Sequence, residues 1–135
     1  MSAPHLFAQR VMRILQTPTA RFLLAALFGT SGTLHFIFPN NYANVIPPWL
    51  PAHAALVAIS GIAELAGAIG LLIPVTRRLA GWGLLVLCVA VFPANIQMWL
   101  TAIAQSKPLW ITSLLLLRLP LQVPLMLWIW CAMKG

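Results

Sequence analysis

Four long runs of apolar residues follow one another along the chain, separated by short connections. The runs cover residues 22–38, 52–73, 79–102 and 111–133. Each approaches or exceeds the roughly 20 residues that a helix needs to cross the hydrocarbon core of a bilayer. The connections after the second and third runs are short, so neighbouring helices must run antiparallel. The pattern therefore predicts an all-α integral membrane protein built as a four-helix bundle.

The segment before the first run, residues 1–20, has a different pattern. Its apolar side chains share one face of a helix, and its polar ones lie opposite. The apolar face comprises Leu6, Phe7, Val11, Ile14 and Leu15, and the polar face Gln9, Arg10, Arg13 and Gln16. This predicts an interfacial amphipathic helix on an anionic leaflet, with a frayed basic tail as the alternative. We divide the chain into this segment, 1–20, and a membrane domain, 21–135.

The connection between the first two runs, residues 39–51, is the longest and carries no charge. Its prolines and asparagines favour a stiff segment rich in turns. Tyr42 and Trp49 are its large aromatic residues. They either anchor the loop in the lipid interface or cap a cavity beneath it.

Composition narrows the function classes. About 61% of the residues are hydrophobic and 7% are charged, and the mean hydropathy is +0.95. Soluble domains carry ~25% charged residues. This balance excludes a disordered chain and argues against a soluble enzyme. The net charge of +7 comes from eight Lys and Arg residues against one acid. The cations flank or interrupt apolar runs instead of clustering on one face, so we expect no nucleic-acid partner.

The same cations predict the orientation in the membrane. All of them except Lys107 and Arg118 fall on one side of a four-pass topology. Because basic residues are enriched on the cytoplasmic side of membranes, both termini are expected to be cytoplasmic.

Two charged residues, Glu64 and Arg118, lie well inside predicted spans. A single charge at the centre of a membrane helix costs ~2.5–3.5 kcal/mol. We expect the two to lie at similar depth and to form an ion pair, because mutual attraction offsets much of the desolvation. Glu64 shares its helix face with small residues such as Gly61 and Gly67, which suits a close contact inside the bundle.

Other polar side chains are predicted in the same outer half of the bundle. The candidate ligand-binding residues are His35, Tyr42, Glu64, Asn95, Arg118 and Gln122. Pro93 and Pro120 add backbone carbonyls that lack helical partners. These groups indicate either a polar, outward-opening pocket or a structural network that fixes the helix register.

Other chemistries find little support. The sequence contains no zinc-binding spacing, phosphate loop, nucleophile elbow or EF-hand loop, so we predict neither catalytic residues nor a metal site. Only His35 and His53 fall on one side as potential haem ligands. Cys88 and Cys131 are far apart in sequence and are expected to be buried free thiols.

Several sequence stretches resemble the DoxX family of small bacterial membrane proteins. They are GTLHFIFPNNYANVIPPWL from Gly32, GIAELAGAIGLLIPVTRRLAGWGL from Gly61, VFPANIQM from Val91 and RLPLQ from Arg118. The resemblance covers most of residues 22–130. It implies a four-helix bundle in the bacterial cytoplasmic (inner) membrane, and a link to quinone-dependent oxidation and to complexes that resist oxidative stress.

Three functions follow from these expectations. The first is an accessory subunit that binds a quinone, a lipid or a similar amphipathic ligand, or docks a membrane redox partner. In it, Arg118 is held by Glu64, and activity is expected at most as part of an oxidoreductase complex, with no intrinsic cofactor. The second is an assembly scaffold for another membrane protein, and a homo-oligomer is also compatible with the chain. The third is a small proton-coupled transporter, although a glutamate paired with an arginine exchanges protons poorly near neutral pH.

Overall fold

The computed structural model describes residues 2–135, and this part of the chain contains helices and no strand. The helices are α1 (Ala3–Leu15), α2 (Pro18–Ile37), α3 (Pro39–Ala43), α4 (His53–Leu72), α5 (Arg77–Ala104) and α6 (Leu109–Lys134). Helices α2, α4, α5 and α6 are long and apolar enough to cross a membrane. The four predicted apolar runs are therefore confirmed as helices of spanning length, each within about one helical turn of its predicted limits. Helix α2 begins early because Thr17 caps it, accepting a hydrogen bond from Ala20 N at 3.2 Å, with Pro18 in the first turn.

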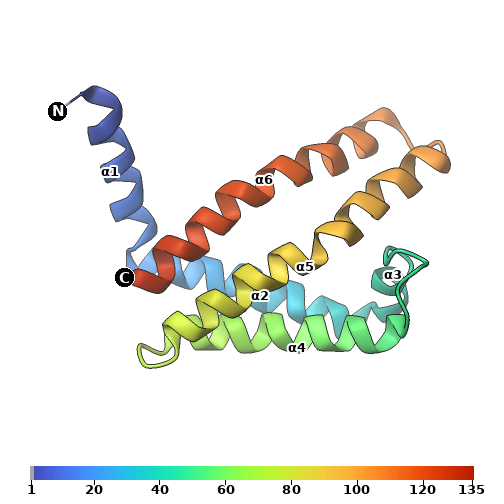
Figure 1. Ribbon diagram of the computed structural model, residues 1–135, viewed down its shortest axis with the longest axis horizontal. Coiled ribbons are helices and arrows are strands. Elements are labelled where there is room, and N and C mark those ends of the chain that lie inside the picture. Colours follow the sequence, from blue (N-terminus) through green and yellow to red (C-terminus); the bar gives the residue numbers. More distant parts are fainter. Residues whose placement is uncertain (1) are drawn as a thin grey trace.

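The four long helices form two pairs that diverge from one another (Figure 1). Helix α2 lies beside α4, and α5 lies beside α6. The pairs meet at the end that carries Arg21, Arg77 and Lys134, which we call the basic end. They separate toward the opposite end, which carries α3 and the α5–α6 connection and which we call the loop end. The bundle is therefore closed at one end and open at the other.

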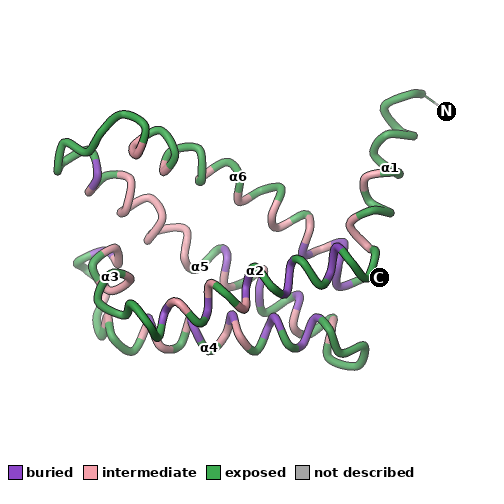
Figure 2. Tube along the Cα trace, turned by 180° about the vertical axis from the view of Figure 1, so that it is seen from behind, coloured by how far each residue is buried: buried purple, intermediate pink, exposed green. Residues whose placement is uncertain are grey.

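The position of the core explains this shape. The largest fully buried apolar side chains of the core come from all four long helices and lie toward the basic end. They are Leu24, Leu71, Leu84 and Ile129. In α6 every buried residue falls within 129–133, whereas the rest of the helix is partly or fully exposed (Figure 2). Several outward-facing apolar residues on these helices, such as Phe22, Ile59, Val86 and Val123, are more than half exposed, as expected for surfaces that contact lipid.

Small residues bring α2 and α4 into close contact. A Cβ atom on Gly32 would lie 2.9 Å from the carbonyl oxygen of Gly61, and one on Gly61 would lie 2.9 Å from the Cβ of His35. Farther along α4, a Cβ on Gly67 would lie 2.5 Å from Leu84 Cδ2. The predicted small-residue face of this helix is thus confirmed as an interior face. Its consequence for the site is that His35 lies directly against the α4 backbone.

Arginines close the basic end by capping helices. The buried Arg21 donates from Nε to the carbonyl oxygen of Ala132 in α6 and from Nη2 to that of Gln16, both at 3.2 Å. Arg77 donates from Nε to the Leu71 carbonyl of α4 at 2.9 Å. Carbonyls in the last turn of a helix lack internal donors, and a cation there also complements the helix dipole. From the sequence these arginines predicted only the orientation in the membrane, and their capping role was not predicted.

The N-terminal segment forms the predicted helix. No residue of α1 in the described chain is buried, and the helix extends away from the bundle at the basic end. Leu6, Phe7 and Ile14 are at least half exposed. The helical state favours the amphipathic-helix interpretation over a frayed tail.

The glycine contact between α2 and α4 gives a stability prediction. Replacing Gly32 by Ala should destabilise the protein by about 1–3 kcal/mol, because the new methyl group meets the Gly61 backbone and overpacks the interface. Gly83→Ala is the matched control, since within the described chain nothing lies within 4 Å of a Cβ at Gly83. We expect the control to be neutral or stabilising by up to about 1 kcal/mol. Thermal unfolding in detergent measures both, and equal shifts would contradict the contact.

Candidate functional site

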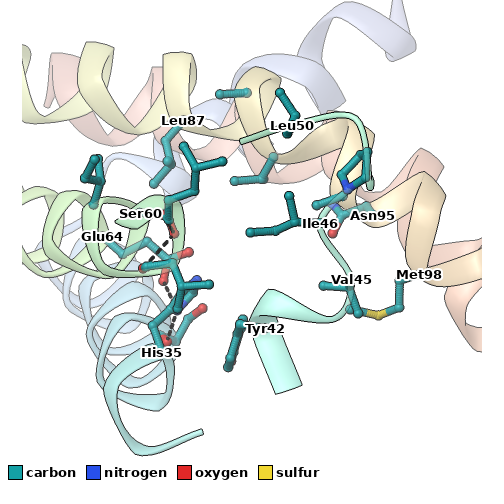
Figure 3. Close-up of a pocket in the computed structure, with 18 of the residues that line it drawn as sticks. His35, Tyr42, Val45, Ile46, Leu50, Ser60, Glu64, Leu87, Asn95 and Met98 are labelled. Carbon is teal, nitrogen blue, oxygen red and sulfur yellow. Dashed lines mark hydrogen bonds and ion pairs between the residues drawn. The ribbon is translucent and has the colours of Figure 1, made fainter. Parts of the chain in front are cut away.

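A cavity of about 370 Å³ lies between the two helix pairs toward the loop end. Figure 3 shows Glu64 and Ser60 on α4, His35 on α2, Tyr42 on α3, and Asn95 and Met98 on the facing α5. The loop after α3 contributes Val45, Ile46 and Leu50. The volume lies within the ~300–1,000 Å³ of small-molecule sites. Apolar walls with a few polar groups are also typical of such sites.

A second cavity of about 260 Å³ adjoins the first. Both are lined by Ser31, Glu64, Leu87, Val91, Asn95 and Arg118. The second cavity extends between α2 and α6, where its other walls include Leu27, Phe28, Leu121 and Leu125. Glu64 and Arg118 therefore stand at the boundary of two neighbouring spaces.

Glu64 is held at one wall of the first cavity. Its residue is 8% exposed, and its Oε2 lies 3.5 Å from Nδ1 of His35. The same Nδ1 lies 2.8 Å from the carbonyl oxygen of Ser31. A carbonyl only accepts, so Nδ1 carries a proton and donates it mainly to Ser31. Glu64 Oε2 is consequently buried without a hydrogen-bond partner in the described chain.

Tyr42 covers this pair from the loop. Its ring stacks on that of His35 with 4.0 Å between centroids and 25° between planes. Burial, and next the negative charge of Glu64, raise the pKa of Tyr42 above its usual 10.0, against a smaller opposite effect of Arg118. The hydroxyl thus stays protonated and able to donate at physiological pH. Tyr42 caps the cavity, whereas Trp49 is 72% exposed and free to contact the interface.

Arg118 lines both cavities but does not pair with Glu64. Within residues 2–135, the basic side chain that contacts Glu64 is His35, at 3.5 Å, and the side-chain contact of Arg118 is from Nη1 to Met98 Sδ at 3.7 Å. The expected direct ion pair is therefore wrong. The physical reason is the divergence of the helix pairs: α6 lies across the cavity from α4, whereas α2 is in close contact with α4.

Asn95 and Gln122 connect α5 to α6. Gln122 donates from Nε2 to the carbonyl oxygen of Cys88 at 2.8 Å, and Asn95 donates from Nδ2 to Gln122 Oε1 at 3.4 Å. Of the six candidate residues, the structure gathers His35, Tyr42, Glu64, Asn95 and Arg118 around the first cavity. Gln122 lines only the second cavity and is committed to the α5–α6 contact.

Sequence reasoning missed Ser31, which lines both cavities and accepts the hydrogen bond from His35. Its position one turn before His35 on the same face of α2 is the signal that could have found it. Cys88 and Cys131 are buried free thiols, as predicted. The described chain contains no group of three or more His, Cys, Asp or Glu side chains able to hold a metal ion.

Comparison with known proteins changes the family assignment. No curated protein and no solved structure matches the chain. A family model does match residues 24–133, and it is not that of DoxX, which gives no match. The expected DoxX membership is therefore wrong. The stretches that carried the resemblance consist mostly of small, apolar, aromatic and proline residues, which membrane bundles share for physical reasons. The chain belongs to the family described as Domain of unknown function (DUF8561).

Proposed function

We propose that this protein is a membrane-embedded binding protein that holds an amphipathic molecule in the cavity between its helix pairs. The observation that carries the proposal is that Glu64 and Arg118 line one cavity without pairing with each other. Charged groups inside a bilayer are expensive and are normally paired or functional. A polar group of a bound molecule, surrounded by the apolar walls, supplies the partner that the protein does not.

Lipids and quinones both combine an apolar tail with acceptor oxygens, and both fit this description. The oxidoreductase role expected from DoxX is not part of the proposal, because the resemblance that implied it is wrong. The binding role stands on residues that physical reasoning identified independently of the family.

We infer the orientation from the positive-inside rule. Arg21, Arg77 and Lys134 cap or flank helices at the basic end, and Lys107 is in the connection at the loop end. The rule puts the basic end, with α1, on the cytoplasmic side. The cavity then opens toward the opposite leaflet.

The orientation predicts cysteine accessibility in cells. In a variant with Cys88 and Cys131 replaced by Ala, a cysteine at Lys107 should react with a membrane-impermeant maleimide, because it lies outside. A cysteine at Arg78, between α4 and α5, should react only after the membrane is permeabilised. The opposite labelling pattern would overturn the orientation and leave the cavity unaffected.

The binding role predicts that a large side chain placed in the cavity reduces ligand binding. A dodecanol carrying a photoreactive diazirine on its chain should crosslink to cavity residues such as Leu87 and Val91 in nanodiscs. Ala94→Trp fills the cavity and should reduce this crosslinking by about fivefold or more, since one large side chain occupies a substantial share of the volume.

Val89→Trp is the matched control, on the same helix but 62% exposed and absent from both cavity walls. It should leave cavity crosslinking unchanged. Peptide mass spectrometry maps the sites. Crosslinks spread evenly over the outward-facing surfaces, or equal effects of the two variants, would refute the binding role.

Proton-coupled transport is a second candidate function, and the surroundings of Glu64 favour it. Glu64 is buried in α4 without the arginine partner that was expected to keep it charged, so no arginine in contact with Glu64 opposes proton exchange. The closed core at the basic end argues the other way, since Leu24, Leu71, Leu84 and Ile129 would have to separate for a molecule to pass.

Proton movement distinguishes binding from transport. In liposomes loaded with the pH dye pyranine, adding dodecyl phosphate or dodecyltrimethylammonium outside should change the internal pH no more in protein-containing than in empty vesicles. A change that requires the protein and disappears in Glu64→Gln would establish the transporter instead. Thermal unfolding of Glu64→Gln checks that the variant is folded.

A further inference from the structure

We propose that the bound molecule carries an anionic head group, a carboxylate or a phosphate, held by Arg118, and that its apolar tail lies in the second cavity between α2 and α6. The inference rests on the proposed binding function and specifies its ligand class and its route from the bilayer.

The charged residues of the chain favour an anionic ligand. Glu64 is the sole acidic residue among 135, against eight Lys and Arg residues. It is held beside His35 and forms no ion pair with Arg118. No other side chain in the sequence supplies a carboxylate. A cation in the membrane needs a counter-charge, and because Glu64 does not contact Arg118, an anionic ligand would supply that charge at hydrogen-bonding distance.

Arg118 has the free donors for this role. A guanidinium carries five N–H groups in a planar fork that matches carboxylate and phosphate oxygens. In the described chain its hydrogen-bond contact is one weak acceptor, Met98 Sδ, at 3.7 Å. The protonated hydroxyl of Tyr42 lines the same cavity and adds a neutral donor. Free donors therefore predominate around the cavity, which suits a head group rich in acceptors.

A cationic head group fits less well. The carboxylate of Glu64 lines the cavity wall, but its unpartnered oxygen, Oε2, is buried beside His35 and is not accessible to a ligand. Arg118 lines the same space and repels a positive charge. Glu64 in turn disfavours an anion at the α4 wall, so the head group is directed to the α6 side.

The second cavity provides a lateral path for the tail. It meets the first cavity at Arg118 and is otherwise walled mainly by apolar side chains. Two of these, Leu27 on α2 and Leu121 on α6, are 49% and 54% exposed. The cavity thus reaches the outward surface between these helices. A molecule with its head on Arg118 can extend its tail toward the bilayer without crossing water.

The test compares head groups on one chain. Dodecanoate, dodecyl phosphate, dodecanol and dodecyltrimethylammonium compete with the diazirine dodecanol for cavity crosslinking in phosphatidylcholine nanodiscs. We expect the two anions to compete about tenfold or more better than the alcohol and the cation, as charge-assisted hydrogen bonds to arginine allow. Diazirine forms of the anions should crosslink along Leu27, Phe28 and Leu125.

Substitutions test the contribution of Arg118 to the preference for anions. Arg118→Gln should remove the preference for anions, so that they compete no better than dodecanol, while Arg118→Lys, which keeps the charge, should retain part of the preference. Arg78→Gln removes an exposed charge at the basic end and should change nothing. Thermal unfolding confirms that each variant is folded.

Each outcome has a separate meaning. Equal competition by all four head groups, or preference for the ammonium, would overturn the anionic head group while the binding function stands. Inorganic phosphate competing as well as dodecyl phosphate would overturn the tail assignment and identify a free anion. Absence of cavity crosslinking with every probe would remove both the binding function and this inference.

Discussion

The contact between Gly32 and Gly61 decides which side chain meets the chain's sole acid. With no side chains between them, α2 and α4 approach until the backbone of one touches the other, and His35 comes within 3.5 Å of Glu64. The core and the arginine caps that join the α5–α6 pair to this unit lie toward the basic end. Arg118 therefore faces Glu64 across a cavity instead of contacting it.

Much of the fold could be predicted from the sequence, because its signals are local. Lengths of apolar runs fix the spans, the spacing of Gly61 and Gly67 marks the interior face of α4, and Tyr42 marks the loop above the cavity. The number of residues between a side chain and the end of its span gives its depth in the membrane, and this count put Glu64 and Arg118 in the same outer half. The count does not give the lateral distance between two helices, however.

The lateral arrangement depends on where the core lies, which is a property of four helices together. His35 and Arg118 were both predicted in the outer half of the bundle with Glu64, and only Arg118 was expected to pair with it; the divergence of the helix pairs puts His35 in contact instead. The capping by Arg21 and Arg77 was hidden for a related reason: membrane topology and helix capping favour basic residues at the same positions. The sequence therefore indicated the topological role of these arginines but not their capping role.

A ligand on Arg118 would also act on the protein's own stability. In the structure Arg118 is exposed and lines both cavities, and in a bilayer its guanidinium would need either water drawn into the membrane or a counter-ion. A molecule that binds the folded state alone stabilises it in proportion to its affinity and concentration. An amphiphile already dissolved in the membrane reaches a high local concentration beside this gap. If the cavity binds such a molecule, the folded protein would be more stable with an anionic amphiphile at Arg118 than without one, an effect that a passive scaffold would not show.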